Sequence, residues 1–246
     1  MRYLIKFSYD GSNYAGYQIQ PKLNTIQGKL EDAICKINNG KRKTVQASGR
    51  TDKGVHAICQ YAHVDLDISI TEKKLKKALN TYLPDDIHVI KTSIVDDNFH
   101  ARYDVKSKEY KYILNMGEYN PFDRNYVFQY NYKLNVENIR KSISVFEGKH
   151  DFRAFVSENK NKKDCVRVIE KAIVEQENKK LVFTFKGNGF MKYQIRNMVG
   201  SLIKVGEGKM DKEGLKNILD SCDRTKGGVT APSNGLYLVD VSYKQQ

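Results

Sequence analysis

The order of the predicted strands and helices is the feature that most restricts the fold of this chain. In the first half, apolar side chains alternate from Tyr3 to Tyr9, which is typical of a strand with one buried face. Thr25 and Thr71 each precede apolar residues at helical spacing, so each predicts the start of a helix. The predicted elements are a strand at 3–9, a helix after Thr25, strands near 44–48 and 57–66, a helix after Thr71 and a strand near 87–95. This half therefore has the order β-α-β-β-α-β.

The second half repeats this order with one additional helix. Its predicted elements are a strand at 107–115, a helix at 135–147, strands at 164–175 and 180–187, helices at 191–205 and 211–220, and a strand at 235–243. The repeated order is that of the ferredoxin-like pattern. We therefore predict an α+β protein of two ferredoxin-like halves, residues 1–105 and 106–246, that share a mostly antiparallel sheet with the helices packed on one face.

The balance of charge favours an anionic partner. The chain has 42 Lys and Arg against 29 Asp and Glu, which gives a formal net charge of +13. Proteins this basic commonly bind nucleic acid, although a positive charge can also serve solubility alone. The Lys-rich segment "NKNKKD" (159–164) is either a solvated loop tip or an RNA contact.

Several kinds of site and location find no support in the sequence. The four cysteines form no CxxC pair, which favours a reducing cytoplasm over a zinc ribbon or a disulfide scaffold. No apolar run approaches the roughly 20 residues that span a bilayer, so we expect no membrane segment. The segment "GEGKM" (206–210) lacks the Ser or Thr of a phosphate-binding loop, and the histidines have no metal-ligand spacing. The Asp pairs at 85–86 and 96–97 are better explained by turns. We therefore expect neither a metal nor another cofactor.

The segment "GRTDKG" (49–54) concentrates charge between two predicted strands. Arg50, Asp52 and Lys53 lie between Gly49 and Gly54. Such a segment is often only a tight turn, in which Asp accepts backbone hydrogen bonds and Gly adopts a positive φ. Here, however, the loop projects from a scaffold of strands, where sites are commonly built, and the neighbouring cations favour the ionised form of Asp52. An ionised carboxylate can act as a nucleophile or as a base.

This segment and six others resemble, in the same order, the tRNA pseudouridine synthase A (TruA) family. They are "YDGSNYAGYQIQ" (9–20), "GRTDKGVHA" (49–57), "LPDDI" (83–87), "DDNFHARYDVKSKEYKYILN" (96–115), "EGKHDF" (147–152), "GFMKYQIRNMVGSL" (189–202) and "APSNGLYL" (231–238). The segments extend over the whole chain, which makes the resemblance specific. It implies a homodimeric enzyme that converts uridine to pseudouridine at positions 38, 39 and/or 40 of the tRNA anticodon stem-loop, with no cofactor.

The resemblance also implies roles for five residues. Asp52 matches the catalytic aspartate, in a reaction that breaks the N1–C1′ bond, turns the uracil and joins C5 to C1′. Arg50 matches the arginine that keeps the target nucleotide out of the stack, which offsets the few kcal/mol that extrusion costs. Arg196 matches the arginine that pairs with the aspartate, Tyr110 the tyrosine that stacks on the uracil, and Leu236 the apolar residue that packs on the base. The first half would carry the catalytic loop, and the second would complete the active-site cleft.

The pattern of residues alone permits plainer interpretations. Tyr110 fits the buried face of a strand, Leu236 the start of a strand, and Arg196 the surface of a helix. Two positions also depart from the family pattern, because Lys53 replaces a small or short polar residue and Tyr17 replaces a tryptophan. Neither change removes a group that the chemistry needs.

Two other functions are compatible with parts of the sequence. A non-catalytic RNA-binding protein or RNA chaperone on the same scaffold would tolerate Asn at position 52, whereas the enzyme would not. A metal-dependent nuclease or phosphatase would need clustered carboxylates, and the acidic residues of this chain are scattered. The presence of Asp52 together with Arg50, Tyr110 and Arg196 favours the enzyme.

Overall fold

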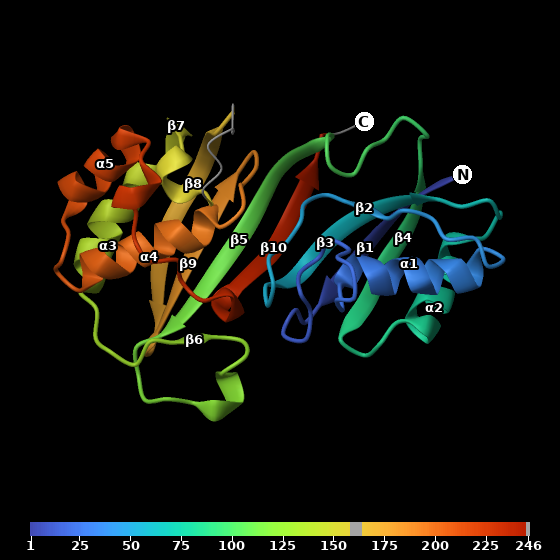
Figure 1. Cartoon of the computed structure of the whole chain (residues 1–246), viewed down its shortest axis with the longest axis horizontal. Coiled ribbons are helices and arrows are strands. Elements are labelled where there is room, and N and C mark those ends of the chain that lie inside the picture. The colour runs from blue at the N-terminus through green and yellow to red at the C-terminus, as the bar shows by residue number, and fades with distance from the viewer. Residues whose placement is uncertain (158–163, 245–246) are drawn as a thin grey trace. The chain divides into compact units, whose positions relative to one another are not determined.

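The computed structural model of the chain describes residues 1–157 and 164–244, and it divides into two compact units. The first unit is Met1–Lys106 with the final strand from Tyr237 onward, and the second is Ser107–Leu236 (Figure 1). The expected division at 105/106 assigned that final strand to the second half, whereas it groups here with the first unit. Of the Lys-rich segment 159–164, all but Asp164 lies outside the described residues.

The first unit follows the predicted order of elements and has β10 in addition. They are β1 (Arg2–Tyr9), α1 (Ile26–Ile37), β2 (Gln46–Ala47), β3 (His56–Asp65), α2 (Glu72–Tyr82), β4 (Ile87–Val95) and β10 (Leu236–Tyr243). Strand β1 lies between β4 and β3 and is antiparallel to both, and β2 is antiparallel to β3. Strand β10 runs parallel to the start of β3, with Tyr237 opposite His56.

The core of the first unit follows from the alternation seen in the sequence. Tyr3, Ile5, Phe7 and Tyr9 of β1 are buried, while the residues between them are partly exposed. As predicted, Thr25 caps α1, since its side chain accepts a hydrogen bond from the backbone N–H of Gly28 at 3.3 Å. One face of β1 is therefore covered and the other is only partly so, as expected for helices packed on one side.

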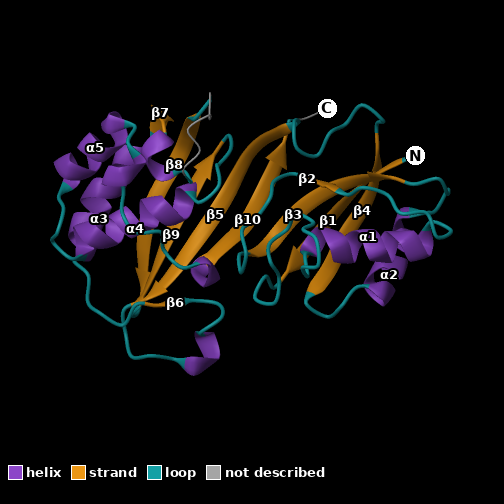
Figure 2. Cartoon of the chain, viewed as in Figure 1, coloured by secondary structure: helices purple, strands orange, loops and turns teal. Residues whose placement is uncertain are grey.

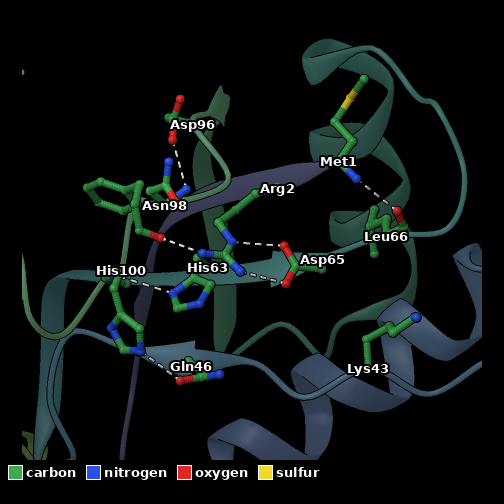
Figure 3. Close-up of polar contacts among 12 residues, drawn as sticks. Met1, Arg2, Lys43, Gln46, His63, Asp65, Leu66, Asp96, Asn98 and His100 are labelled. Atoms are coloured by element: carbon green, nitrogen blue, oxygen red, sulfur yellow. Dashed lines mark hydrogen bonds and ion pairs between the residues drawn. The ribbon is translucent and has the colours of Figure 1, made fainter.

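Arg2 fastens the start of β1 to two neighbouring segments. Its guanidinium donates two hydrogen bonds of 2.8 Å to the Asp65 carboxylate at the end of β3 (Figure 3). A third N–H donates to the Phe99 backbone oxygen at 2.8 Å. Beneath it lies His63, whose Nδ1 accepts the backbone N–H of Ala101 at 3.1 Å. The segment after β4 is thus held against the sheet.

Apart from the final strand, the second unit contains the strands and helices predicted for the second half, and it has two short strands that were not predicted (Figure 2). Its elements are β5 (Val105–Asn115), β6 (Phe128–Gln129), α3 (Val136–Ile143), β7 (Gly148–Asp151), β8 (Val166–Glu177), β9 (Lys180–Gly187), α4 (Gln194–Gly206) and α5 (Lys212–Ser221). Strands β5, β9, β8 and β7 are neighbours in that order and antiparallel, and β6 is parallel to β5. The helix predicted at 135–147 ends at Ile143 and continues as a 3-10 turn, Ser144–Phe146.

The predicted α+β class is confirmed, because both units combine helices with mostly antiparallel strands. The ferredoxin-like character of each half stays a prediction. Within the described ranges, none of the helices has the length and apolar character needed to cross a membrane.

Candidate active site

The loop that carries Asp52 connects β2 and β3. Backbone hydrogen bonds hold it, one within the loop and two to the segment around Tyr14 and Tyr17. The backbone N–H of Tyr17 donates to the Thr51 carbonyl oxygen at 3.1 Å. The N–H of Val55 donates to the Asp52 carbonyl oxygen at 3.2 Å, and the N–H of Gly54 to the Tyr14 oxygen at 3.4 Å. The segment from Gly11 to Tyr17 therefore lies along the loop, and we call this segment the wall of the loop.

Two glycines allow this wall to approach the loop. A Cβ atom at Gly11 would lie 2.0 Å from the carbonyl oxygen of Val55, so no side chain fits there. A Cβ at Gly16 would lie 2.9 Å from the Thr51 carbonyl oxygen, and its φ of +105° is a conformation that favours glycine. The spacing of the glycines in "YDGSNYAGY" is thus explained by contact with the Asp52 loop.

Buried side chains fix the part of the loop that precedes Asp52. The hydroxyls of Tyr9 and Thr51 are 2.8 Å apart, and burial raises the pKa of Tyr9 to about 12 although the bond to Thr51 opposes the shift. The Tyr9 hydroxyl therefore remains protonated and available for this bond at ordinary pH. Gln60, which is fully buried, donates from Nε2 to the Gly49 oxygen at 3.0 Å.

His56 joins the end of the loop to β10. Its ring is buried and stacks on Tyr237 with a centroid separation of 4.7 Å and an interplanar angle of 24°. Its Nδ1 lies 3.1 Å from both the Gly11 backbone nitrogen and an Asp10 carboxylate oxygen. In the hydrogen bond from the Gly11 N–H, Nδ1 is the acceptor.

The outcome of these contacts is a clamped loop with accessible charged groups. Thr51 and Val55 are buried, whereas Asp52 is partly exposed and Arg50 and Lys53 are exposed. The arrangement can present a carboxylate to a substrate without having to order the loop first. This is the pre-organisation that catalysis by a side chain requires.

The second unit holds the other predicted residues, beginning with Arg196 on α4. Its Nε donates to the Ala231 carbonyl oxygen at 2.7 Å, and its own carbonyl accepts the Ala231 N–H at 3.1 Å. The guanidinium carbon lies 5.0 Å from the centroid of the Tyr193 ring, within the range of a cation–π contact. Gly200 allows the segment 229–231 to lie close to α4, since a Cβ at Gly200 would lie 1.7 Å from the Val229 carbonyl oxygen.

Tyr193 is a functional candidate that the sequence analysis missed. It precedes α4 with φ 65° and ψ −3°, a left-handed conformation that costs about 1–3 kcal/mol for a residue with a bulky side chain. Such strain is concentrated at sites where the surrounding structure enforces it. A left-handed tyrosine gives no signal in the sequence, because the positions that predict this conformation are usually Gly or Asn.

Tyr110 and Leu236 are buried within the second unit. Tyr110 lies on β5 opposite Phe185 and packs edge-on against Phe190 at 5.3 Å. Leu236 follows the 3-10 turn Ser233–Gly235, which approaches β5 so closely that a Cβ at Gly235 would lie 2.5 Å from the Ile113 oxygen. Tyr110 therefore lies on the buried face of a strand and Leu236 begins one, as the pattern of residues alone predicts.

Tyr112 connects these elements. Its hydroxyl donates to the Pro232 carbonyl oxygen at 2.8 Å. Burial raises the pKa of Tyr112 strongly, and the positive charge of Arg196 acts in the opposite direction. Arg196 is thus close enough to influence this tyrosine, and β5, α4 and the segment 231–236 form one connected structure.

The predicted site residues accordingly form two groups. Arg50 and Asp52 belong to the first unit, and Tyr110, Arg196 and Leu236 belong to the second. The pairing of Arg196 with Asp52 stays a prediction. In the described part of the chain, no group of three or more His, Cys, Asp or Glu side chains could hold a metal ion.

Comparison with known proteins identifies the kind of protein that this chain is similar to. A family described as tRNA pseudouridine synthase matches residues 5–104 and 143–244. A protein of Bacillus thuringiensis subsp. konkukian called tRNA pseudouridine synthase A 1 is 45% identical over 237 residues, which cover 96% of each chain. Proteins called tRNA pseudouridine synthase A from Limosilactobacillus reuteri and Streptococcus pneumoniae serotype 19F are 41% and 43% identical over 247 residues. They cover 98% and 99% of this chain, and 96% and 99% of their own length is matched.

Proposed function

This chain belongs to the tRNA pseudouridine synthase family, an enzyme family that isomerises uridine to pseudouridine, and from that premise we propose that it acts on the anticodon stem-loop of tRNA. The proposed target is uridine 38, 39 and/or 40. Asp52 is the proposed catalytic residue, and the reaction needs no cofactor. We also propose that the enzyme is a homodimer in the cytoplasm.

The clamped loop is the observation that most supports Asp52. Its neighbours Thr51 and Val55 are buried and hydrogen-bonded, while Asp52 itself is partly exposed. An isomerisation of this kind breaks the N1–C1′ bond, turns the uracil, joins C5 to C1′ and releases the C5 proton. A fixed carboxylate at the ribose can act in it as nucleophile or as base.

The other residues are proposed to hold the substrate. Arg50, exposed on the same loop, fills the space that the target nucleotide leaves in the stack. Tyr110 stacks on the uracil, Leu236 packs on the base, and Arg196 binds beside the catalytic carboxylate. The contacts of Arg196 with Ala231 and Tyr193 support this role because they restrict its side chain to one arrangement.

The proposed architecture is that of two ferredoxin-like halves. The first unit supports it, because its elements follow the order β-α-β-β-α-β and β1 lies between β4 and β3. In this proposal residues 1–105 supply the catalytic loop, and residues 106–246 supply the remaining substrate contacts.

A tritium-release assay tests the proposed function. The substrate is a tRNA that carries uridine tritiated at C5, at one of the positions 38, 39 and 40 at a time. We expect release of tritium to water, undiminished by a chelator. Asp52→Asn should abolish release and leave the affinity for tRNA within about tenfold, because only the reacting group is changed. Asp85→Asn, the same change at an exposed turn residue, is the matched control and should retain full turnover. Normal turnover of Asp52→Asn would refute the assignment.

A further inference from the structure

A line of polar contacts joins helix α4 to the segment 224–231. The buried Oγ of Ser201 accepts the backbone N–H of Gly228 at 3.1 Å. One helical turn earlier, the Oδ1 of Asn197 accepts the Thr230 hydroxyl at 2.6 Å. The segment therefore lies along α4 in the opposite direction, and its last residues reach the first turns of the helix.

The side chain of Asn197 is fully buried, and both ends of its amide are bound. Its Nδ2 donates to the Phe155 carbonyl oxygen at 2.7 Å. Its Oδ1 accepts an N–H of the Arg224 guanidinium at 3.1 Å in addition to the Thr230 hydroxyl. Because the amide nitrogen donates and the amide oxygen accepts, these partners permit one orientation of the side chain. Asn197 is thus a fixed acceptor for Thr230.

Thr230 directly precedes the residue that binds Arg196. The N–H of Ala231 donates to the Arg196 carbonyl oxygen at 3.1 Å, and the Ala231 carbonyl oxygen accepts the Nε of Arg196 at 2.7 Å. The side chain of Val229 is 75% exposed, so it cannot hold the segment against α4. The hydroxyl of Thr230 is therefore the side-chain contact that sets the backbone next to Ala231.

The close packing of the segment on α4 transmits a displacement at Thr230. A Cβ atom at Gly228 would lie 2.7 Å from the Oγ and 2.8 Å from the backbone nitrogen of Ser201. A Cβ at Gly200 would lie 1.7 Å from the Val229 carbonyl oxygen. With backbone packed against backbone, a shift of the segment at Thr230 moves the Ala231 carbonyl as well.

We propose that Thr230 is a positioning residue for the reaction. Bound to Asn197, its hydroxyl fixes the Ala231 carbonyl, and this carbonyl directs the guanidinium of Arg196. Such positioning matters because a displacement of about 1 Å in a site can lower a rate about 100-fold. The inference rests on the proposed function and on the role proposed there for Arg196, and it names a residue on which that role depends.

Tritium release by three variants of the segment 224–231 tests the proposal. Thr230→Val removes the hydroxyl and should lower kcat about 3- to 10-fold, the rate equivalent of one neutral hydrogen bond, while the KM for tRNA changes less than about twofold. Thr230→Ser keeps the hydroxyl and should retain kcat within about twofold of the wild type. Thr225→Val is the matched control, because it removes a hydroxyl that binds Asp223 at 2.7 Å in the same segment, and it should leave kcat unchanged. Urea unfolding establishes that each variant is folded.

Combination with Arg196→Lys shows whether Thr230 acts through Arg196. Lysine lacks the Nε that binds the Ala231 carbonyl, so adding Thr230→Val to Arg196→Lys should lower kcat by less than a further 1.5-fold or about that. A further loss as large as that in the wild-type background would overturn the inference, because the two residues would then act independently.

The remaining outcomes separate this inference from the proposed function. If the wild-type protein releases tritium and Thr230→Val keeps full kcat, only the role of Thr230 is refuted. A raised KM with unchanged kcat in Thr230→Val would also refute it, and would make Thr230 a contact for tRNA binding. Absence of tritium release by the wild-type protein would refute the proposed function, and the role of Thr230 with it.

Discussion

Arg196 is restrained at its backbone and along its side chain by groups of its own unit. Its carbonyl and its Nε both bind Ala231, and its guanidinium lies over the ring of Tyr193. Lys192 also lies 5.0 Å from that ring, so two cations share one aromatic side chain. The ring can orient the guanidinium only while Tyr193 keeps its left-handed backbone.

Substitutions at Tyr193 separate the ring from the backbone. Tyr193→Phe keeps the aromatic face and should change turnover less than about threefold. Tyr193→Asn tolerates the left-handed conformation but removes the ring, and should lower kcat about 3- to 30-fold, the equivalent of one cation–π contact. The KM for tRNA should change little, because the overall binding surface is intact. The measurement is tritium release under saturating and limiting tRNA. Equal losses in the two variants would show that the ring has no part in orienting Arg196.

His63 is a buried histidine whose environment favours the neutral form. Burial, with a smaller contribution from the positive charges of Arg2 and His100, lowers its pKa to about 4, although Asp65 and Asp104 act in the opposite direction (Figure 3). The neutral ring is the form that can accept the Ala101 N–H at Nδ1. Below the ordinary pKa of 6.5, the unfolded chain takes up a proton at this residue and the folded chain does not.

This difference predicts a loss of stability on acidification. Between pH 6.5 and 4 the free energy of unfolding should fall, with a contribution from His63 of about 2 kcal/mol at pH 5 relative to pH 7. Urea unfolding at a series of pH values measures the slope. His63→Asn retains an acceptor and should reduce the slope, whereas His88→Asn, at an exposed position, should not. A slope that is the same in His63→Asn and the wild type would contradict the assignment.

Sequence reasoning at the scale of residues singles out candidates whose charges lie together in one short segment. Arg50, Asp52 and Lys53 were identified because their charges lie together between two glycines. Tyr193 was missed because its importance arises from a backbone conformation that its neighbours impose. His56 was missed because its partners, Gly11 and Tyr237, are distant in the sequence.

At the scale of elements, the loop that carries Asp52 depends on the segment from Gly11 to Tyr17. The two segments contact each other through backbone atoms, so a change of side-chain rotamer cannot relieve a clash between them. A change in this wall should therefore act on the position of Asp52 as well as on stability.

Gly11→Ala tests this dependence. The added methyl would lie 2.0 Å from the Val55 oxygen, so the loop must move; we expect a loss of more than about 2 kcal/mol in the free energy of unfolding and at least a tenfold loss in turnover. Gly40→Ala is the control, because Gly40 has a φ of +75° but no atom within 4 Å of its would-be Cβ. It should cost about 1–2 kcal/mol in stability and leave turnover unchanged. Full activity of folded Gly11→Ala would show that the wall does not position Asp52.

The elements themselves were predictable to the extent that each carries its own period. The alternation of β1 and the capped helix α1 needed no tertiary information. Strands β6 and β7 are too short to show a period, and their pairing with β5 and β8 defines them. The end of α3 at Ile143 was misjudged, because the 3-10 turn that follows continues the apolar spacing as far as Phe146.

At the scale of the whole molecule, the position of the final strand in the sequence does not predict the unit to which it belongs. The residues from Tyr237 onward group with the first unit through parallel pairing of β10 with the start of β3. This pairing places Tyr237 on His56, beside the loop that carries Asp52. His56 directly follows the loop that carries Asp52, so the final strand contacts the first unit at the end of this loop.

The net charge of +13 leads to a prediction for the whole protein rather than for any one residue. If binding of tRNA neutralises 6–10 phosphates, the affinity should fall about 10³- to 10⁵-fold between 50 and 200 mM salt, because counterions are released. Fluorescence anisotropy with labelled tRNA at several salt concentrations measures the slope of log K against log salt. Phe122→Ser should keep this slope, because Phe122 is exposed and uncharged. A nearly flat salt dependence of the wild type would mean that the basic surface serves solubility, and that recognition of tRNA depends mainly on uncharged contacts.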